Sequence, residues 1–470
     1  MQQPSEVRAA FQAPVGDARP AAGWLNRRRK VMLIAAGVLT VAALVAGVAT
    51  FTADNHTPAA AAPTQTASDT ATSPSASASS EAEPDDPGTL AMQILNRGTA
   101  ALLKGDEAGW LAIVDPSKPK LRAYYRDLYT SLRGLGVTQL QYRRLIPKPV
   151  GWEDASWDED FYLTYCFSMS SCPPFKYLNP GGPGAPMITQ GLTIRKLAGR
   201  DYRITKVAKA KQASEGWQST PWQVDRLVLA KGKRVTVAAS RGNAGRLRQV
   251  LAAAEQAATR ADHYAKLIGN PQSRYRVYLA TDRQWRTWYG GPHGRWAIGY
   301  TTFPQGVLSE IVLRTSEAGR GRDLENLIQH EMAHAVTLGG LDLGAQSIVN
   351  PDMWLQEGIA EYIAYAPRPA TATTRLPEVR QTLRSTRRPT SVALGELDND
   401  ASLRQSSVFY GLSHFAVDCI AQKYGETKLL DFIDLTLGQN MGYDKASEQV
   451  FGTPFRPVDR ACIAWMQQQV

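Results

Sequence analysis

Hydrophobic residues recur every three or four positions in several stretches of the chain, which is the spacing of an amphipathic helix. These stretches are residues 90–103, 121–132, 244–267 and 403–423. Shorter runs rich in β-branched and aromatic residues predict strands. They are residues 161–167, 192–194, 202–207, 227–230, 235–238, 275–280 and 311–313. Because the early helices are followed by a run of strands, we predict an α+β fold class.

Turn and linker residues suggest how these elements are grouped. Gly199, Arg200 and Asp201 are expected to turn a hairpin between two of the strands. A linker predicted at residues 217–221 separates an α+β module, residues 90–215, from a second domain, residues 216–470. The Pro-, Thr- and Arg-rich sequence from residue 366 to 400 is interpreted as a mobile loop.

Residues 31–51 carry no charge, and a helix of that length measures about 30 Å, the thickness of a hydrocarbon core. A basic cluster precedes them. We therefore predict a transmembrane helix at 31–51, with residues 1–30 as a cytoplasmic tail and all later residues on the extracytoplasmic side of the cell membrane. A buried helix of a soluble protein is the alternative.

Residues 52–89 are rich in Ala, Ser, Thr and Pro and contain no Lys or Arg, which predicts a disordered stalk. The chain carries +10 overall, with +4 on residues 1–30 and −6 on the stalk, which leaves +12 on residues 90–470. Contact with anionic cell-wall polymers or lipid head groups is one interpretation, and an ordinary solvated surface is the other. Nucleic acid is not an expected partner, because the basic residues are scattered and form no known module.

The four cysteines all fall on the predicted exported side, where disulfides are permitted. Four cysteines allow three pairings. Pairing by proximity in the sequence joins Cys166 to Cys172 and Cys419 to Cys462.

Candidate chemistry is concentrated in the stretch Gln329-His330-Glu331-Met332-Ala333-His334. His330 and His334 are four residues apart, so on a helix they lie on the same face and are placed to share a metal ion. Asp323 is expected to cap this helix, and Gly339 with Gly340 to end it. Glu331 borders the position of a metal-activated water and is placed to take its proton.

A third metal ligand is expected from the stretch Trp354-Leu355-Gln356-Glu357-Gly358-Ile359-Ala360-Glu361-Tyr362. Glu357 and Glu361 are again four residues apart on a predicted helix and face the same way. We assign Glu357 to the metal and Glu361 to the free ring N–H of a ligating histidine. The alternative is that both carboxylates belong to a solvated helix face.

The two motifs together resemble the gluzincin zinc metallopeptidases, the clan of thermolysin and the zinc aminopeptidases, and more narrowly the bacterial peptidase MA-like group. The resemblance implies Zn²⁺ held by His330, His334 and Glu357, with Glu331 as general base. It also implies a downstream donor for the developing oxyanion. Tyr410 matches the region of that donor, although Tyr410 and His414 packed in a helix core is the alternative.

Other families fit less well. Thr337 and Gly340 stand where a metzincin needs Gly and His, and the chain has no Gly-x-Met-Glu-Asn stretch of the aminopeptidase kind.

The segment from Leu103 to Leu111 resembles the start of the nuclear-transport-factor-like cone fold, which implies a spacer or docking role for the module.

Two further features bear on substrate binding. An aromatic-rich loop, with Trp285, Trp288, Tyr289, Trp296, Tyr300 and Phe303, either packs in the core or walls a groove, and packing is the favoured interpretation. The strand at 311–313 directly precedes the motif helix, so as an edge strand it would pair with an extended peptide.

The sequence therefore predicts a membrane-anchored, extracytoplasmic zinc metallopeptidase that cleaves peptide or protein substrates. Its alternatives are a non-catalytic surface binding protein on the same scaffold and an aminopeptidase.

Overall fold

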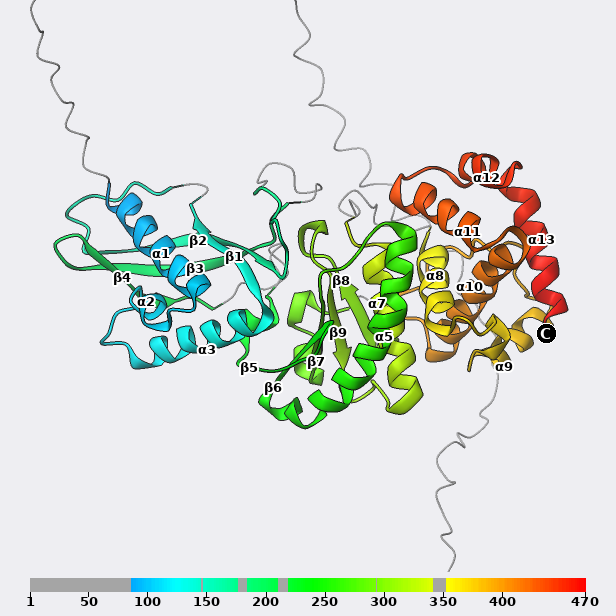
Figure 1. The fold of residues 1–470 in the computed structure, drawn as a ribbon, viewed down its shortest axis with the longest axis horizontal. Helices are drawn as coiled ribbons and strands as arrows, with labels where there is room; N and C mark the ends of the chain where they lie inside the picture. Colours follow the sequence, from blue (N-terminus) through cyan, green and yellow to red (C-terminus); the bar gives the residue numbers. More distant parts are fainter. Residues whose placement is uncertain (1–85, 145–146, 176–183, 210–218, 293, 341–351) are drawn as a thin grey trace, which may run out of the picture. The chain divides into compact units, whose positions relative to one another are not determined.

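Two β-sheets organise the part of the chain that the structure describes (Figure 1). The structure is a computed structural model, and it describes residues 86–144, 147–175, 184–209, 219–292, 294–340 and 352–470. The predicted tail 1–30 and nearly all of the predicted stalk lie outside these residues, as do the first two residues of the predicted linker. The end of the stalk was placed too late, because a helix begins at Pro87 and its first turn is capped by Asp86.

The predicted membrane anchor requires a correction. Across the described ranges, none of the helices combines the length and the apolar character that crossing a membrane requires. The segment on which the prediction rested, residues 31–51, lies outside the described residues. A single-pass anchor and the membrane location derived from it, which rested on the length of the uncharged segment and the basic cluster before it, therefore have no support in this fold.

The first sheet belongs to the module and is a simple antiparallel meander in the order β1-β2-β3-β4. Its strands are β1 (Val137–Arg143), β2 (Ser156–Phe167), β3 (Met187–Ala198) and β4 (Asp201–Val207), and its helices are α1 (Pro87–Lys104), α2 (Glu107–Leu111) and α3 (Pro119–Leu135). The predicted hairpin is confirmed as β3 and β4. The Cys166–Cys172 disulfide is also confirmed, and it joins the end of strand β2, at Cys166, to the loop that follows the strand.

The second sheet has the order β5-β6-β7-β9-β8, and its three central strands are parallel. Its strands are β5 (Leu227–Lys231), β6 (Val235–Ser240), β7 (Tyr275–Ala280), β8 (Gly299–Thr302) and β9 (Glu310–Arg314). The long helix α5 (Leu247–Ile268) connects β6 to its parallel neighbour β7. The predicted α+β class was therefore wrong: strands and helices alternate here, and the chain is mixed α/β.

The two faces of the second sheet are covered differently. Strand residues alternate between the faces. Val277 and Ile311 face a core built with α5 and with α7 (Gly321–Thr337). Tyr278 and Val312 face the opposite way and share a core with the module. The module thus covers one face of the sheet, while the helices that carry the histidine motif cover the other.

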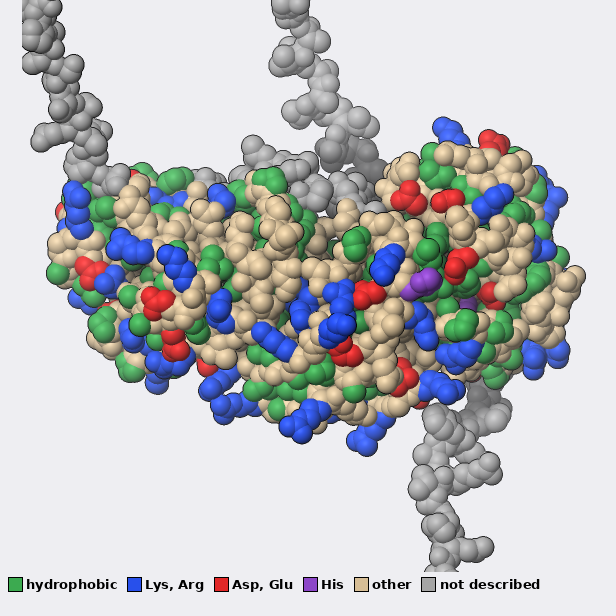
Figure 2. All heavy atoms as spheres, in the orientation of Figure 1, with side chains coloured by type: hydrophobic (Ala, Val, Ile, Leu, Met, Phe, Trp, Pro, Cys, Tyr) green, Lys and Arg blue, Asp and Glu red, His purple; other side chains and the backbone are tan. Residues whose placement is uncertain are grey.

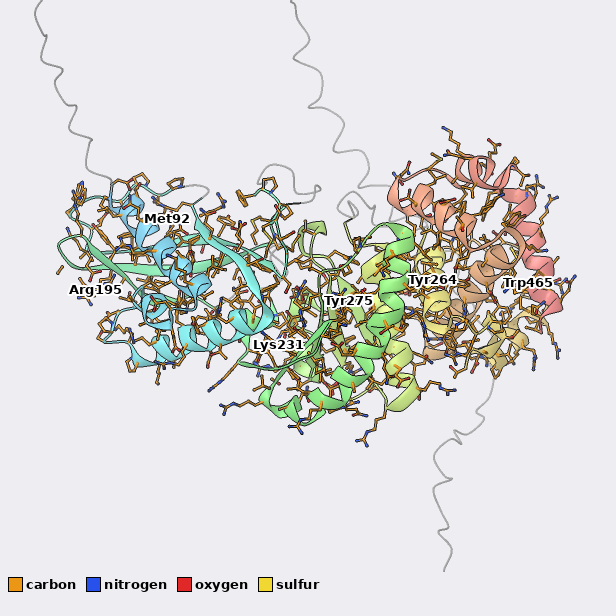
Figure 3. All side chains as sticks on the ribbon, viewed as in Figure 1. Met92, Arg195, Lys231, Tyr264, Tyr275 and Trp465 are labelled. Carbon is orange, nitrogen blue, oxygen red and sulfur yellow. A yellow bond between two sulfur atoms is a disulfide. The ribbon has the colours of Figure 1, made fainter. Side chains whose placement is uncertain are left out.

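The remaining α-helices of the described residues lie before and after α7. They are the short α4 (Pro221–Val224) and α6 (Asp282–Trp285), followed after α7 by α8 (Met353–Tyr365), α9 (Leu376–Leu383), α10 (Leu403–Tyr424), α11 (Glu426–Ile433), α12 (Tyr443–Phe451) and α13 (Phe455–Gln468). The predicted Cys419–Cys462 pair is confirmed and joins α10 to α13. Tyr264 of α5, labelled in Figure 3, donates to Glu426 Oε1 over 2.8 Å, and Tyr362 of α8 donates to the same oxygen over 3.0 Å. These bonds tie α5, α8 and α11 together.

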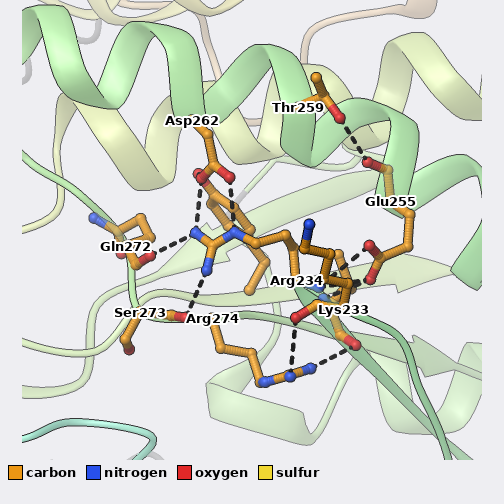
Figure 4. A network of polar contacts seen from close by, with 10 residues as sticks. Lys233, Arg234, Glu255, Thr259, Asp262, Gln272, Ser273 and Arg274 are labelled. Atoms are coloured by element: carbon orange, nitrogen blue, oxygen red, sulfur yellow. Dashed lines mark hydrogen bonds and ion pairs between the residues drawn. The ribbon is translucent and has the colours of Figure 1, made fainter.

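A polar network fixes α5 against the sheet (Figure 4). The guanidinium of Arg234, at the start of β6, donates to both carboxylate oxygens of Asp262 over 2.7 Å. The backbone N–H groups of Arg234 and Val235 donate to Glu255, about two turns earlier on α5, over 2.9 and 2.8 Å. Because α7 packs beside α5, this network also sets the position of the histidine motif. Other basic side chains are dispersed over the face seen in Figure 2 rather than gathered in one patch.

Candidate metal centre

Two neighbouring helices bring three ligand-type side chains together. His330 and His334 lie on α7 and Glu357 lies on α8. The Nε2 atoms of the histidines are 3.1 Å apart, and Glu357 Oε2 lies 3.1 Å from the first and 3.3 Å from the second. Four-coordinate tetrahedral zinc with bonds of about 2.0–2.1 Å needs ligand atoms about 3.3 Å apart. The three atoms therefore form a group that could hold a metal ion.

Burial makes this arrangement unfavourable without a cation. Both histidines are buried, each with 8% of its surface exposed, and Glu357 is partly buried. Burial alone would lower the pKa of His330, but Glu357 and Glu361 raise it to about 10. Burial would likewise raise the pKa of Glu357, yet the two histidines hold it far below its usual range. The site thus favours positive charge among these groups, which a proton or a metal ion supplies.

Glu361 stands behind His330, as the sequence predicted. Its Oε1 lies 3.1 Å from His330 Nδ1, the ring nitrogen that faces away from the ligand group. Its Oε2 accepts a hydrogen bond from Arg375 Nη1 over 2.7 Å. Burial opposes ionisation of Glu361, but Arg375 and His330 lower its pKa to about 2. Glu361 is therefore a carboxylate held between a histidine ring and a guanidinium, not part of a solvated helix face.

Sequence reasoning missed Arg375 because it placed residues 366–400 in a mobile loop. The segment instead contains α9 and a buried backbone link, in which Ala370 N–H donates to Asp418 over 2.7 Å. Val379 and Leu383 anchor α9 in the main core. The four-residue spacing of Val379 and Leu383 is typical of a helix, but the Pro- and Arg-rich residues around them favoured a loop.

Glu331 lies next to the ligands on α7 and has only 3% of its surface exposed. The hydroxyl of Thr301, on β8, lies 2.8 Å from Glu331 Oε2 and is its donor. Burial raises the pKa of Glu331, and the nearby histidines and Thr301 oppose that rise. A carboxyl with a raised pKa is better suited to exchanging protons near neutral pH than an ordinary glutamate.

Tyr410 lies on α10, and its ring borders the metal-ligand group beside His330. Its ring centroid lies 5.7 Å from that of His330 and 5.6 Å from that of Trp296, while the Arg375 guanidinium lies 5.4 Å from its ring. Burial, followed by the charges of Glu357 and Glu331, raises the pKa of Tyr410 well above 10. Its hydroxyl is therefore protonated and able to donate.

His414, one turn further along α10, does not join the group. Its ring is fully buried and lies 5.2 Å from the ring of Tyr365. Burial lowers its pKa to about 4, which leaves it neutral. The interpretation of a residue packed in the helix core therefore holds for His414, whereas Tyr410 borders the candidate metal centre.

A cavity of about 380 Å³ opens beside the ligand group, and Trp296, Gly299, His330, Glu331, Arg375 and Tyr410 are among its lining residues. A larger cavity, of about 1350 Å³, lies between the module and the second sheet. None of the metal-ligand candidates lines it, so the larger of these two cavities is not the one beside the ligand group. The smaller cavity is the candidate active site because the ligand candidate His330 and the titratable groups Glu331 and Tyr410 line it.

Two predictions about the surroundings are decided by the fold. Trp285, Trp288 and Tyr289 are buried in the core shared with the module, which confirms packing for these residues, while Trp296 lines the cavity. The proposed edge strand at 311–313 is ruled out, because β9 lies between β7 and β8. Within the described ranges, the strand at that end of the sheet is β8, which also carries Thr301.

The predicted ends of the motif helix are confirmed only in part, because Asp323 does not cap it. The predicted cap Asp323 lies inside the first turn of α7, whose N-cap is Arg320, and the helix ends at Thr337, just before the two predicted glycines.

No protein-family model matches the sequence, and no curated protein matches it either. A function must therefore be argued from the candidate metal centre itself.

Proposed function

We propose that the chain is a zinc metallopeptidase of the gluzincin type. The observation that carries the proposal is the triangle of His330 Nε2, His334 Nε2 and Glu357 Oε2, with sides of 3.1 to 3.3 Å. Two imidazoles and one carboxylate leave a fourth position of a tetrahedral ion open, which is the ligand count of a catalytic rather than a structural zinc site. The adjoining cavity gives that position access to a substrate.

The proposed role of Glu331 is to move protons. A zinc ion held by His330, His334 and Glu357 would polarise the substrate carbonyl and lower the pKa of water. Glu331 takes the proton from the attacking water and then delivers it to the leaving amine, so that the amide nitrogen departs neutral. Its raised pKa and its place on the cavity wall support this role.

Tyr410 is proposed to stabilise the carbonyl oxygen as negative charge develops on it. A protonated hydroxyl that borders the cavity supports this role, since a donor aimed at a developing oxyanion contributes to the rate. Glu361, backed by Arg375, is proposed to fix the orientation and tautomer of His330.

The proposed substrate is an extended peptide. The end strand β8 borders the cavity through Gly299, and a sheet edge binds peptides by adding them as a further strand. β8 takes the role that the sequence had suggested for β9, because β9 is paired with a strand on both sides. A carbonyl of the added strand would then come close to the ligand group. An aminopeptidase would require in addition a site for the free amino terminus of its substrate, and the sequence has no Gly-x-Met-Glu-Asn stretch of the kind that provides one.

The test is metal content and peptide cleavage by the purified full chain, with Glu331→Gln beside it. We expect about one zinc ion per chain, cleavage of an unbiased peptide library detected by mass spectrometry, and a loss of about 10²- to 10⁴-fold in the variant with zinc retained. Glu325→Gln, a change on the same helix but away from the cavity, is the matched control and should cleave normally.

Other outcomes separate the alternatives. Bound zinc without cleavage of any peptide would favour the non-catalytic binding scaffold. Cleavage confined to amino-terminal residues would favour an aminopeptidase. A folded chain that binds no metal ion would overturn the proposal.

A further inference from the structure

Two residues of β8 face the side chain of Glu331. Gly299 and Thr301 are two positions apart on a strand, so they point to the same face of the sheet. On that face lies α7, and the contacts of both residues are with Glu331. One short strand therefore meets both oxygens of a single carboxylate.

The contact at Thr301 is a hydrogen bond. Its hydroxyl lies 2.8 Å from Glu331 Oε2 and 2.9 Å from the backbone oxygen of the same residue. A hydroxyl has one proton, and the carboxylate is the stronger acceptor because it is charged. Thr301 therefore holds one oxygen of Glu331 at a fixed point.

The contact at Gly299 is steric. A Cβ atom placed on Gly299 would lie 2.5 Å from Glu331 Oε1 and 3.0 Å from its carboxyl carbon. Both distances are well below ordinary van der Waals contact. The absence of a side chain at 299 is therefore what allows the carboxyl group to lie flat against the strand.

We propose that Gly299 and Thr301 are positioning residues for Glu331: Thr301 holds one carboxylate oxygen and Gly299 makes room for the other. This inference rests on the proposed function, in which Glu331 is the base. Neither residue touches the reacting atoms in this proposal.

The backbone groups of the same two residues also face the sheet edge, where β8 is the last strand within the described residues. Arg314 N–H donates to Ile298 O over 3.0 Å, so positions 298, 300 and 302 direct their backbone groups toward β9. By the alternation of an antiparallel ladder, the backbone groups of Gly299 and Thr301 point the other way. A peptide added at this edge would pair with the residues that position the base. Correct strand pairing and correct placement of Glu331 are thereby coupled.

The test compares Thr301→Val with Thr301→Ser in the full chain. Valine keeps the shape of threonine and removes the hydroxyl, whereas serine keeps the hydroxyl. For valine we expect kcat to fall about 10- to 100-fold, with KM within about twofold and the zinc content unchanged, because a base displaced by about 1 Å loses that much. Serine should restore most of the rate. Thr302→Val, on the same strand but the opposite face, should behave as wild type.

Gly299→Ala is the second variant, and it acts by displacement instead of by loss of a hydrogen bond. It should lower kcat by a similar factor while zinc content and the midpoint of thermal unfolding stay close to wild type. Wild-type kcat in both Thr301→Val and Gly299→Ala would overturn the proposal. Equal losses in Thr301→Ser and Thr301→Val would also overturn it, because the hydroxyl would then have no role.

Failure of the proposed function gives a different result. If the wild-type chain cleaves no peptide, crystal structures of the variants still decide the positioning. We expect the Glu331 carboxylate to leave its place in Thr301→Val and to keep it in Thr301→Ser. An unmoved carboxylate in Thr301→Val would overturn the inference whatever the activity of the chain.

Discussion

Each face of the second sheet covers a buried group of charged side chains. On the helical side lies the metal-ligand group, with His330 and Glu357 as members. On the module side Arg276 Nε donates to Glu310 Oε1 over 2.8 Å, and the two side chains are 3% and 0% exposed. Burial raises the pKa of Glu310 in spite of its partner, so both faces hold acids whose pKa is shifted by burial and by neighbouring charges.

The two groups differ in how their charges are matched. Arg276 and Glu310 form one ion pair, sealed among aromatic rings such as that of Phe167, 5.5 Å from the guanidinium. The metal-ligand group instead directs three lone-pair atoms at one point and adjoins a cavity. A perturbed pKa thus marks burial in both places. Convergence of acceptors on a common point, with access from outside, marks only the candidate metal centre.

The largest expected effect comes from removing a ligand. His334→Ala should reduce the bound metal from about one ion per chain to almost none, because two ligands cannot hold zinc in a catalytic geometry. A chelator should lower the unfolding midpoint of the wild type and leave that of the variant unchanged, since a ligand that binds only the native state stabilises it. Metal analysis and thermal unfolding check both points. Metal retained at full stoichiometry in the variant would contradict the ligand assignment.

Breaking the ion pair on the other face should affect stability and not metal content. Arg276→Met leaves Glu310 buried without a partner, and we expect a loss of about 3–5 kcal/mol in the free energy of unfolding. The double variant Arg276→Met/Glu310→Leu should regain most of it. Urea unfolding measures the loss. Loss of the metal ion from a folded Arg276→Met variant would contradict this prediction, because it would show that the two faces are not independent.

His414 tests whether burial alone explains a shifted pKa on the helical side. Its pKa of about 4 lies below the unfolded value of 6.5, so the unfolded chain binds more protons between these values. The stability contributed by neutral His414 is therefore complete above pH 6.5 and is lost as the pH falls towards 4, by about 3 kcal/mol. His414→Phe should remove this dependence. Unfolding curves of both proteins from pH 4 to 7.5 give the difference, and parallel curves would contradict the assignment.

Local patterns in the sequence predicted the elements that carry the ligands. Helical spacing placed His330 and His334 on one face of α7, and the predicted strand 275–280 coincides with β7. The disulfide pairing followed from proximity in the sequence alone. These features depend on neighbours within a few turns of the chain or, for the disulfides, on a short list of possibilities.

Features that depend on distant contacts were missed. Thr301 reaches Glu331 across 30 positions, and Arg375 reaches Glu361 only because α9 packs on the main core. The central position of β9 depends on β8 adding antiparallel at the end of the sheet, which no periodicity encodes. One signal was present and unused: residues 275–280 read Tyr-Arg-Val-Tyr-Leu-Ala, a nearly continuous apolar run, and such a run indicates a strand covered on both faces. It pointed to the module as the second cover.

The smallest expected effect concerns Glu361, which belongs to the helical side without being a ligand. Glu361→Gln removes the negative charge that faces His330 Nδ1 and leaves Arg375 without its carboxylate. We expect metal affinity to fall about 10- to 100-fold, as is usual when the partner of a ligating histidine is changed, with full occupancy at high zinc. Competition with a chromogenic chelator measures this, and Glu357→Gln, which alters a ligand, should fall further. Wild-type affinity in Glu361→Gln would make Glu361 a structural partner of Arg375 and would place it with Glu310 among the paired charges of the core.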